Sequence, residues 1–267
     1  MLQKNKLKLV IFSLVVIIGL SASFIFTRIN YDVPILMYHA LDPKTENVQD
    51  APQLVVSAKK FQEQMDFLKK HHYKVIPLED LINIIKDNRP LPRKTVVITF
   101  DDGYLDNYIN GFPILKKNNF SAIIFIIVEK IGLHGYMDLA QIKELIKNNI
   151  SIGSHTLTHK YLPNASEEEL MREIKYSKII LESYLNHPIN IICYPTGGFT
   201  PKVQKLVKGA GYIGACSTNR ALNNKIKKNK DIYALRRIKI TDKDSLFKFR
   251  LKVSGYYYLF KKFKNPA

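Results

Sequence analysis

The chain has 267 residues, of which 46% are hydrophobic and 24% are charged, and this balance excludes an intrinsically disordered protein. Its 41 lysines and arginines outnumber its 23 acidic residues, so the net charge of +18 favours nucleic acid, anionic lipid headgroups or acidic cell-wall polymers as partners. We find no RNA- or DNA-binding motif, and the basic residues are spread along the chain, so we expect no nucleic-acid partner.

The first 26 residues predict a membrane segment. Lys4, Lys6 and Lys8 precede the run LVIFSLVVIIGLSASFIF, which has no charged residue and is just long enough for a helix to cross a hydrocarbon core of about 30 Å. The basic flank predicts that the N-terminus stays in the cytoplasm. We therefore expect residues 1–30 to be an uncleaved anchor at the cell membrane, with residues 31–267 outside. The alternative is a signal peptide, cleaved near LSAS, and a secreted domain.

Beyond residue 31, short apolar runs alternate with longer amphipathic stretches. The runs that we expect to form strands are residues 33–39, 73–78, 96–100, 121–128, 150–154, 189–195, 212–218 and 233–240. The stretches that we expect to form helices are residues 57–73, 78–88, 111–118, 138–148, 169–185, 201–211 and a last piece from Asp244. Alternating strands and helices predict a parallel sheet with crossover helices. We expect an α/β fold, a distorted (β/α) barrel of about seven parallel strands after an N-terminal hydrophobic helix.

The two cysteines, Cys193 and Cys216, both lie in apolar runs that we expect to be strands. Buried free thiols are therefore the favoured prediction. If the two strands are neighbours, a single disulfide is the alternative. An exported domain of this size with two cysteines does not depend on a disulfide framework.

Two adjacent carboxylates, Asp101 and Asp102, follow a buried strand in the segment VVITFDDGY. Side chains at consecutive strand positions point to opposite faces, so the two carboxylates separate just past the strand end. One can then hold a cation while the other accepts and gives protons. The alternative is an ordinary solvated turn, because Asp-Asp-Gly is a common turn sequence.

A pair of histidines, His155 and His159, comes directly after the predicted strand ISIGS. Such a pair alone often marks a helix face, but active residues of a barrel gather at the carboxyl ends of its strands, where the two aspartates also lie. Two imidazoles and one carboxylate are a common ligand set for catalytic zinc and leave a position open for water. The metal lowers the pKa of that water, and the second aspartate then accepts its proton.

Three motifs together, TFDDGY, SHTLTH and CYPTGGF, resemble those of the polysaccharide deacetylases, the family-four carbohydrate esterases. The resemblance covers the chain from residue 33 to about residue 245. The segments VPILMYHAL and LVVSAKKFQEQMDFLKKHHYKVIPLEDL resemble the N-terminal signature of one branch, the poly-N-acetylglucosamine deacetylases that include the intercellular adhesin deacetylases. In that branch the order of the motifs is permuted, and the general-acid histidine lies in the early MYH stretch.

The resemblance assigns the two aspartates and the histidine pair to different roles. Asp101 is expected to be the general base, and Asp102, His155 and His159 to be the metal ligands. The metal is a divalent ion, for which we expect zinc, although mixed nitrogen and oxygen ligands also accept cobalt, nickel or manganese.

Further roles follow from the same resemblance. His39 is expected to protonate the leaving amine, and Thr196, in YPTGG, to donate its backbone N–H to the oxyanion. Arg237, in LRRIKI, is expected to orient Asp101 and keep it ionised. A hydrogen-bonded histidine at a strand end and a surface arginine paired with another acid are the alternatives for His39 and Arg237.

The sugar site has two tyrosine candidates, Tyr38 and Tyr194, and for each a packed core tyrosine is an equal alternative. The implied reaction is removal of N-acetyl groups from a hexosamine polymer, with release of acetate. We expect the substrate to be poly-N-acetylglucosamine on the cell surface. A peptidoglycan or chitin-oligomer deacetylase, a non-catalytic module that binds wall polysaccharide, and a basic structural protein are the competing hypotheses.

Overall fold

The computed structural model describes residues 12–19, 21, 31–43, 45, 51–218 and 230–257. Its strands are β1 (Ile35–Tyr38), β2 (Lys74–Val75), β3 (Thr95–Phe100), β4 (Ala122–Ile126), β5 (Ile150–Ser154), β6 (Ile191–Cys193), β7 (Gly214–Cys216) and β8 (Ile238–Lys239). Its helices beyond residue 31 are α2 (Ala58–Lys70), α3 (Leu78–Lys86), α4 (Phe112–Asn118), α5 (Leu139–Lys147), α6 (Glu167–Met171), α7 (Ser177–Leu185), α8 (Pro201–Gly209) and α9 (Leu246–Lys252).

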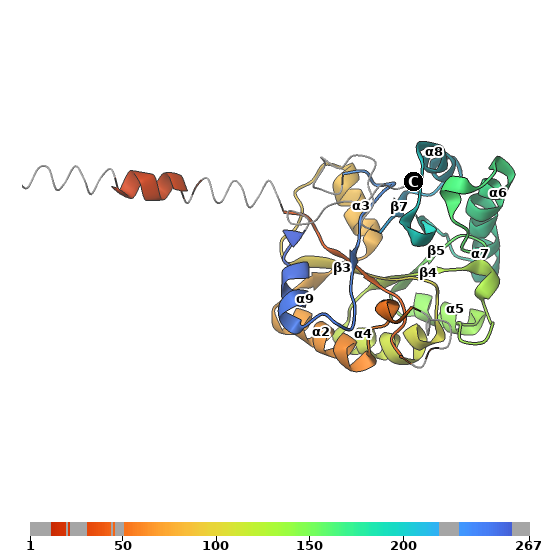
Figure 1. Cartoon of the computed structure of the whole chain (residues 1–267), viewed down its shortest axis with the longest axis horizontal. Coiled ribbons are helices and arrows are strands. Elements are labelled where there is room, and N and C mark those ends of the chain that lie inside the picture. The colour runs from red at the N-terminus through yellow and green to blue at the C-terminus, as the bar shows by residue number, and fades with distance from the viewer. Residues whose placement is uncertain are drawn as a thin grey trace, which may run out of the picture.

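The strands form one parallel sheet in the order β7-β6-β5-β4-β3-β1-β8, and β2 pairs with the start of β3. The strands lie in the middle of the molecule and the helices lie around them (Figure 1). This is the α/β architecture that the alternating pattern predicts, because each crossover helix packs its apolar face against the sheet. Helix α2 shows this packing, with Phe61, Met65 and Leu68 buried.

The last strand segment brings the two edges of the sheet together. Leu235 forms a parallel bridge with Cys216 at the end of β7, and Ile238 pairs with Leu36 of β1. Residues 235–240 therefore contact both edges, consistent with a distorted (β/α) barrel. We expected one strand over residues 233–240, whereas the regular strand covers only Ile238–Lys239, because the segment changes partner along its length.

Consecutive residues of the strands point into two different hydrophobic clusters. Leu36, Ile98 and Ile124 belong to the outer cluster, which also contains Phe61 and Met65 of α2. Ile35, Val97 and Ile123 point to the other face of the sheet and belong to the inner cluster. The inner cluster also contains Leu78, Leu81 and Ile82 of α3. This alternation is the ordinary period of a strand, and it decides which side chains beyond the strand ends point inward.

Two helices contain π-helical segments that the sequence pattern does not predict. The segment Asn107–Gly111 leads into α4, and the segment Arg172–Tyr176 joins α6 to α7. The expected helix over residues 169–185 is therefore continuous in direction but widened in the middle. Such segments are frequent at functional sites, since they re-aim a side chain that a regular helix would direct elsewhere.

The expected N-terminal anchor falls mostly outside the described residues. Residues 12–19 and 21 are helical, but among all the residues that the structure describes no helix is long and apolar enough to cross a membrane. The remainder of residues 1–30 is outside the described part, and so is the tail after Tyr257. The division of the chain at residue 30 therefore stays a prediction.

Candidate active site

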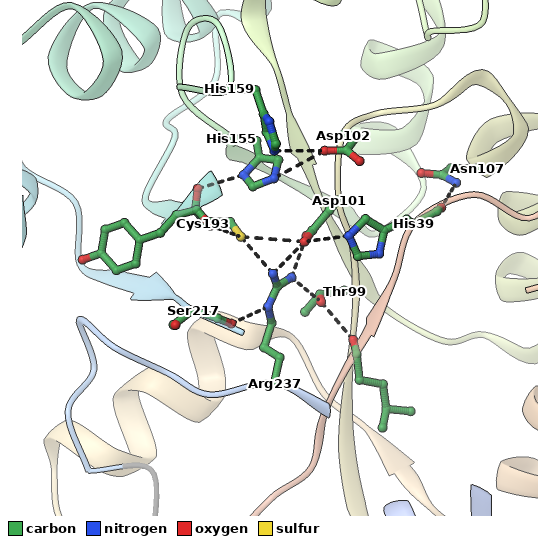
Figure 2. Close-up of polar contacts among 12 residues, drawn as sticks. His39, Thr99, Asp101, Asp102, Asn107, His155, His159, Cys193, Ser217 and Arg237 are labelled. Atoms are coloured by element: carbon green, nitrogen blue, oxygen red, sulfur yellow. Dashed lines mark hydrogen bonds and ion pairs between the residues drawn. The ribbon is translucent and has the colours of Figure 1, made fainter. Parts of the chain in front are cut away.

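The inward-facing positions at the carboxyl ends of the strands carry the polar side chains of the site. Asp101 continues the inner face of β3 after Val97 and Thr99, and His39 continues that of β1. The site also includes His155, which follows β5, and Cys193, the last residue of β6. Arg237 comes from residues 235–240, the closing segment that contacts both edges of the sheet. Figure 2 shows these side chains pointing toward one another around Asp101. The strand period therefore gathers residues that are far apart in the sequence.

The guanidinium of Arg237 is completely buried and fully hydrogen-bonded. It holds Asp101 with two parallel bonds, Nη1 to Oδ1 and Nη2 to Oδ2, both 2.6 Å long. Its other three donors reach Ser217 O at 2.9 Å, Thr99 Oγ1 at 3.0 Å and Cys193 Sγ at 2.9 Å. All five donors of an arginine are thus used, and a lysine has neither the number nor the geometry to replace it.

Asp101 lies between this arginine and His39. Burial alone would raise the pKa of the Asp101 carboxyl, but the Arg237 guanidinium outweighs burial and holds that pKa well below its ordinary value. His39 Nε2 is 3.6 Å from Asp101 Oδ2. Burial lowers the pKa of His39, and the neighbouring Asp101 carboxylate opposes this shift by favouring the protonated imidazole. Asp101 is therefore ionised over the physiological pH range and is poised as a proton acceptor.

The second aspartate leaves the strand in an unusual backbone conformation. Asp102 and Gly103 both have positive φ angles, +72° and +78°. The positive φ favours glycine at position 103, and a Cβ atom there would also lie 2.9 Å from Ile126 Cδ1, so that the end of this side chain would have to shift. The tight turn directs the Asp102 carboxylate toward the two histidines, away from Asp101's arginine partner (Figure 2). This geometry is the structural reason for the Asp-Asp-Gly sequence.

Asp102, His155 and His159 form a group that can hold a metal ion. His155 Nε2 and His159 Nε2 lie 3.4 and 3.6 Å from Asp102 Oδ1, and one ligand atom from each residue lies within 4.8 Å of the others. His155 Nδ1 is 2.8 Å from Cys193 O, and since a carbonyl only accepts, Nδ1 carries the proton and Nε2 presents its lone pair. Burial lowers the pKa of His155 to about 3, so its imidazole is neutral and able to bind a metal.

The loop between the two histidines is fastened by Glu173, which the π-helical segment Arg172–Tyr176 directs inward. Glu173 Oε2 accepts hydrogen bonds from the backbone N–H groups of Leu157 (3.0 Å) and Thr158 (2.9 Å), and Oε1 accepts one from Thr158 Oγ1 at 2.7 Å. Glu173 is only 4% exposed. His159 itself has a positive φ of +71°, so these bonds hold a backbone that would otherwise relax.

The other predicted site residues lie in two different surroundings. Thr196 is exposed in the turn Pro195–Gly197 after β6, at the same end of the sheet as the aspartates, with a φ of +53°. The two tyrosines are in the core, as the alternative interpretation expects. Tyr38 donates to Gln64 Oε1 at 2.7 Å, and Tyr194 donates to Tyr233 O at 2.8 Å. A sugar contact by either tyrosine stays a prediction.

Sequence reasoning did not find four residues that support the site: Cys193, Glu173, Asp106 and Asn107. Cys193 touches Arg237 through its thiol and His155 through its carbonyl, and it is unpaired with Cys216 although the two face each other across β6 and β7. The two free buried thiols that we predicted are therefore confirmed. The other three are polar residues inside helical stretches, where only a structure shows that they point inward.

Comparisons with known proteins show the family to which the chain belongs. A family model described as polysaccharide deacetylase matches residues 88–215, which contain both aspartates and both histidines. YxkH of Bacillus subtilis, assigned by its name to the polysaccharide deacetylases, is 31% identical over 222 residues, which span 83% of this chain and 76% of that protein. The chain belongs to the polysaccharide deacetylase family. It is therefore a hydrolase that acts on carbon–nitrogen bonds other than peptide bonds.

Other relatives of this polysaccharide deacetylase have more specific names. The poly-β-1,6-N-acetyl-D-glucosamine N-deacetylase of Staphylococcus aureus is 27% identical over 201 residues, covering 70% of this chain and 68% of that protein. Among solved structures, the Streptococcus pyogenes deacetylase PplD in complex with acetate superposes with a TM-score of 0.74 at 27% identity, over 83% of this chain and 97% of that chain. IcaB from Ammonifex degensii has a TM-score of 0.70 at 21% identity, over 85% and 97%, and shows that the fold is shared.

Proposed function

We propose that this polysaccharide deacetylase removes N-acetyl groups from poly-N-acetylglucosamine and releases acetate. The observation that carries the proposal is the position of Asp101, held by Arg237 on one side, 3.6 Å from His39 on another, and next in sequence to a residue of the Asp102–His155–His159 group. Amide hydrolysis needs a base, an acid and a metal-binding group, and here the three meet at the carboxyl ends of the strands. The similarity to the Staphylococcus aureus enzyme supports the choice of polymer.

We assign the metal to Asp102, His155 and His159, and zinc is the ion that we propose. Two neutral imidazoles and one carboxylate match a catalytic zinc site with an open position. When bound, the ion supplies Lewis-acid chemistry, which makes water more acidic and an acetyl carbonyl more electrophilic. The Cys193 carbonyl fixes the tautomer of His155, and such outer contacts raise the affinity of a histidine for metal.

The protein's own groups would then move the protons of the reaction. Asp101 accepts the proton of the water that attacks the acetyl carbon, since its pairing with Arg237 keeps it ionised. The new C–O bond forms at the expense of the carbonyl π bond, and the backbone N–H of Thr196 would donate to the developing oxyanion. His39 gives a proton to the amide nitrogen as the C–N bond breaks, so acetate and a free amine leave.

A second substrate, peptidoglycan, is favoured by one comparison. A peptidoglycan-N-acetylglucosamine deacetylase of Bacillus cereus is 31% identical over 125 residues, which cover 46% of this chain and 56% of that protein. The aligned part is about half of each protein, whereas the Staphylococcus aureus enzyme aligns over 70% of this chain and 68% of its own length. We therefore rank peptidoglycan, and with it chitin oligomers, second.

The experiment that tests the proposed function measures acetate release by the purified full-length chain in mild detergent. The substrates are β-1,6-linked N-acetylglucosamine oligomers, β-1,4-linked oligomers and peptidoglycan fragments, each with zinc, with chelator, and with chelator followed by zinc. We expect chelator-sensitive release that is fastest from the β-1,6-linked oligomers. Faster release from peptidoglycan fragments would support the second substrate, and no release from any substrate by metal-loaded protein would contradict the proposal.

We also propose that residues 9–26 hold the chain in the cell membrane with the deacetylase domain outside. The support is the sequence alone, namely the uncharged run and the three lysines before it. Fractionation of cells that express the chain with a C-terminal tag tests this proposal. We expect the full-length chain in the membrane fraction, with its tag accessible to protease in intact protoplasts. A shortened chain in the medium would instead indicate signal cleavage.

A further inference from the structure

The loop that carries His39 is fastened to the helix entrance just beyond the two site aspartates. Residues 39–43 and Thr45 follow β1, and Asp106 and Asn107 lie at the start of the π-helical segment Asn107–Gly111. The two side chains are 7% and 1% exposed. Neither belongs to the base, acid and metal-binding residues described above, so their burial requires another explanation.

The carboxylate of Asp106 is fully used in this connection. Its Oδ2 accepts hydrogen bonds from Leu41 N at 2.8 Å, Asp42 N at 2.9 Å and Thr45 Oγ1 at 2.7 Å. Its Oδ1 accepts a fourth bond from Asn107 Nδ2 at 2.8 Å. An ionised carboxylate is the side chain that can accept four such bonds, whereas an asparagine in its place would turn a donor toward another donor.

Asn107 completes the connection at the histidine itself. Besides Asp106 Oδ1, its Nδ2 donates to the backbone carbonyl of His39 at 2.7 Å. Figure 2 shows this bond to His39. The carbonyl of the preceding residue, Tyr38, accepts from Asp101 N at 3.0 Å, and that of the following residue, Ala40, accepts from Val56 N at 3.0 Å, so the polypeptide is held on both sides of the histidine. Asn107 therefore holds the backbone of His39, and the His39 imidazole extends from that backbone to within 3.6 Å of Asp101 Oδ2.

We propose that Asp106 and Asn107 are positioning residues for His39, which hold its imidazole where it can deliver a proton to the leaving nitrogen. The proposal rests on the proposed function, in which His39 is the acid. Proton transfer needs a heavy-atom separation of about 2.6–3.2 Å. A misplacement of about 1 Å at such a group lowers the rate on the order of 100-fold. The side chains act through the backbone of residues 39–42 and need no contact with the substrate.

The test compares an amide with an activated ester. Cleavage of an N-acetylglucosamine oligomer needs a protonated leaving group, whereas 4-nitrophenyl acetate releases a stable anion and does not. For Asn107→Ala and Asp106→Asn we expect kcat on the oligomer to fall by about 10- to 100-fold with KM nearly unchanged. We expect the rate on the ester to change by less than about threefold and the metal content to stay the same.

Asn118→Ala is the matched control. Asn118 is also a buried asparagine near the same helix, 6% exposed, and its Nδ2 donates to the backbone carbonyl of Ile114 at 3.0 Å. Among the described residues it has no hydrogen bond to the His39 loop, so we expect a comparable loss of stability and unchanged kcat on both substrates. If Asn107→Ala does not fold, Thr45→Val removes only the outer bond to Asp106, and the ratio of oligomer to ester rates should still fall by about two- to fivefold.

A double-mutant cycle with His39→Ala decides whether the two residues act through that histidine. In the His39→Ala background, Asn107→Ala should have no further effect on oligomer cleavage, because the group that it positions is gone. Additive losses, or equal losses on oligomer and ester, would overturn the inference. If the wild type releases acetate and Asn107→Ala does so at the same rate, this inference is overturned and the proposed function stands. If the wild type itself releases no acetate, both the proposed function and this inference are overturned.

Discussion

Arg237 and Asp101 are 136 positions apart in the sequence and form a buried, two-bond ion pair at the centre of the site. The arginine comes from the segment that closes the sheet, and the aspartate from the end of β3. Closure of the barrel and ionisation of the proposed base are therefore coupled. A chain in which the closing segment has not docked leaves Asp101 without the guanidinium that keeps its pKa low.

Replacement of Arg237 should change the pH dependence of catalysis. Loss of a neighbouring guanidinium removes the influence that lowers the Asp101 pKa, while burial, which raises it, remains. For Arg237→Lys we expect the acid limb of kcat/KM to move to higher pH by about 1–3 units, and kcat/KM at neutral pH to fall. The measurement is the pH profile of acetate release.

Arg89→Lys is the control for this change. The Arg89 side chain is 55% exposed and pairs with Asp87 at the surface, so the profile should be unchanged. An unshifted acid limb in Arg237→Lys, with the variant folded, would show that the arginine does not set the protonation of the base.

The Glu173 carboxylate should control metal affinity without touching the metal. A glutamine at position 173 has one acceptor oxygen and one donor NH2 group. Either the NH2 group faces the N–H groups of Leu157 and Thr158, or it faces Thr158 Oγ1 and the bond from that hydroxyl is lost. In both orientations the loop that carries His159 is held less tightly. We expect the affinity for zinc to fall by about 10- to 100-fold, which competition with a chromogenic chelator measures. Glu182→Gln is the control, since Glu182 lies on α7 and accepts from Ile189 N far from the histidines. Equal zinc affinities for both variants would contradict this role.

The two cysteine thiols should be inert in the folded protein. Burial raises the pKa of Cys216 to about 12 and raises the pKa of Cys193 well above its ordinary value, so neither forms a thiolate near neutral pH. We expect no reaction with a chromogenic disulfide reagent under native conditions and titration of both thiols in concentrated guanidinium chloride. Rapid native labelling, or a mass two units low that reveals a disulfide, would disagree with the buried free state.

Acid should destabilise the fold through Asp244. This buried carboxylate binds Lys252, Lys248 and the Thr241 N–H, and together these contacts outweigh burial and lower its pKa. A carboxyl with a lowered folded-state pKa adds stability above its unfolded pKa near 3.8 and loses it as the pH falls through the folded value. We therefore expect the free energy of unfolding to fall below about pH 4. Asp244→Asn should reduce this slope and cost about 3–5 kcal/mol at pH 7, because it removes the negative charge that compensates the buried Lys252 ammonium.

Urea unfolding from pH 7 to pH 3 provides the measurement. Asp66→Asn is the control, since Asp66 is an exposed residue whose carboxylate accepts a hydrogen bond from Gln62, one turn earlier on α2. A slope that is the same in wild type and Asp244→Asn would show that another group carries the acid sensitivity.

Local patterns in the sequence were enough to predict most elements, and together with the family resemblance they predicted the group Asp102, His155 and His159 that the structure brings together. The predicted strand ISIGS is a local feature and is present. The spacing of Ser166 and Glu169 is a local signal too, and the two residues form the capping box that begins α6. The Asp-x-x-Gln pattern at Asp138 and Gln141 is a similar local signal for the capping box that begins α5, and we did not use it. Such features are predictable because they depend on neighbours within a few residues.

Contacts across the barrel could not be predicted in the same way. The helix that we expected begins only at residue 111, and the burial of Asp106 and Asn107 depends on the loop after β1, more than 60 positions away. Likewise the approach of Cys193 to Arg237 depends on how β6 and the closing segment meet. These relationships follow from the register of the sheet, which sequence periodicity alone does not determine.

The most direct test of the account separates the roles of the two adjacent aspartates. Full-length wild type, Asp101→Asn and Asp102→Asn are purified in parallel, and both bound zinc and acetate release from β-1,6-linked N-acetylglucosamine oligomers are measured. We predict that Asp101→Asn keeps its zinc and loses acetate release by about 1,000-fold or more, and that Asp102→Asn loses both. If Asp101→Asn releases acetate at the wild-type rate, Asp101 is not the base. If Asp102→Asn keeps its full zinc content, Asp102 is not a ligand, and either result would contradict the assignment.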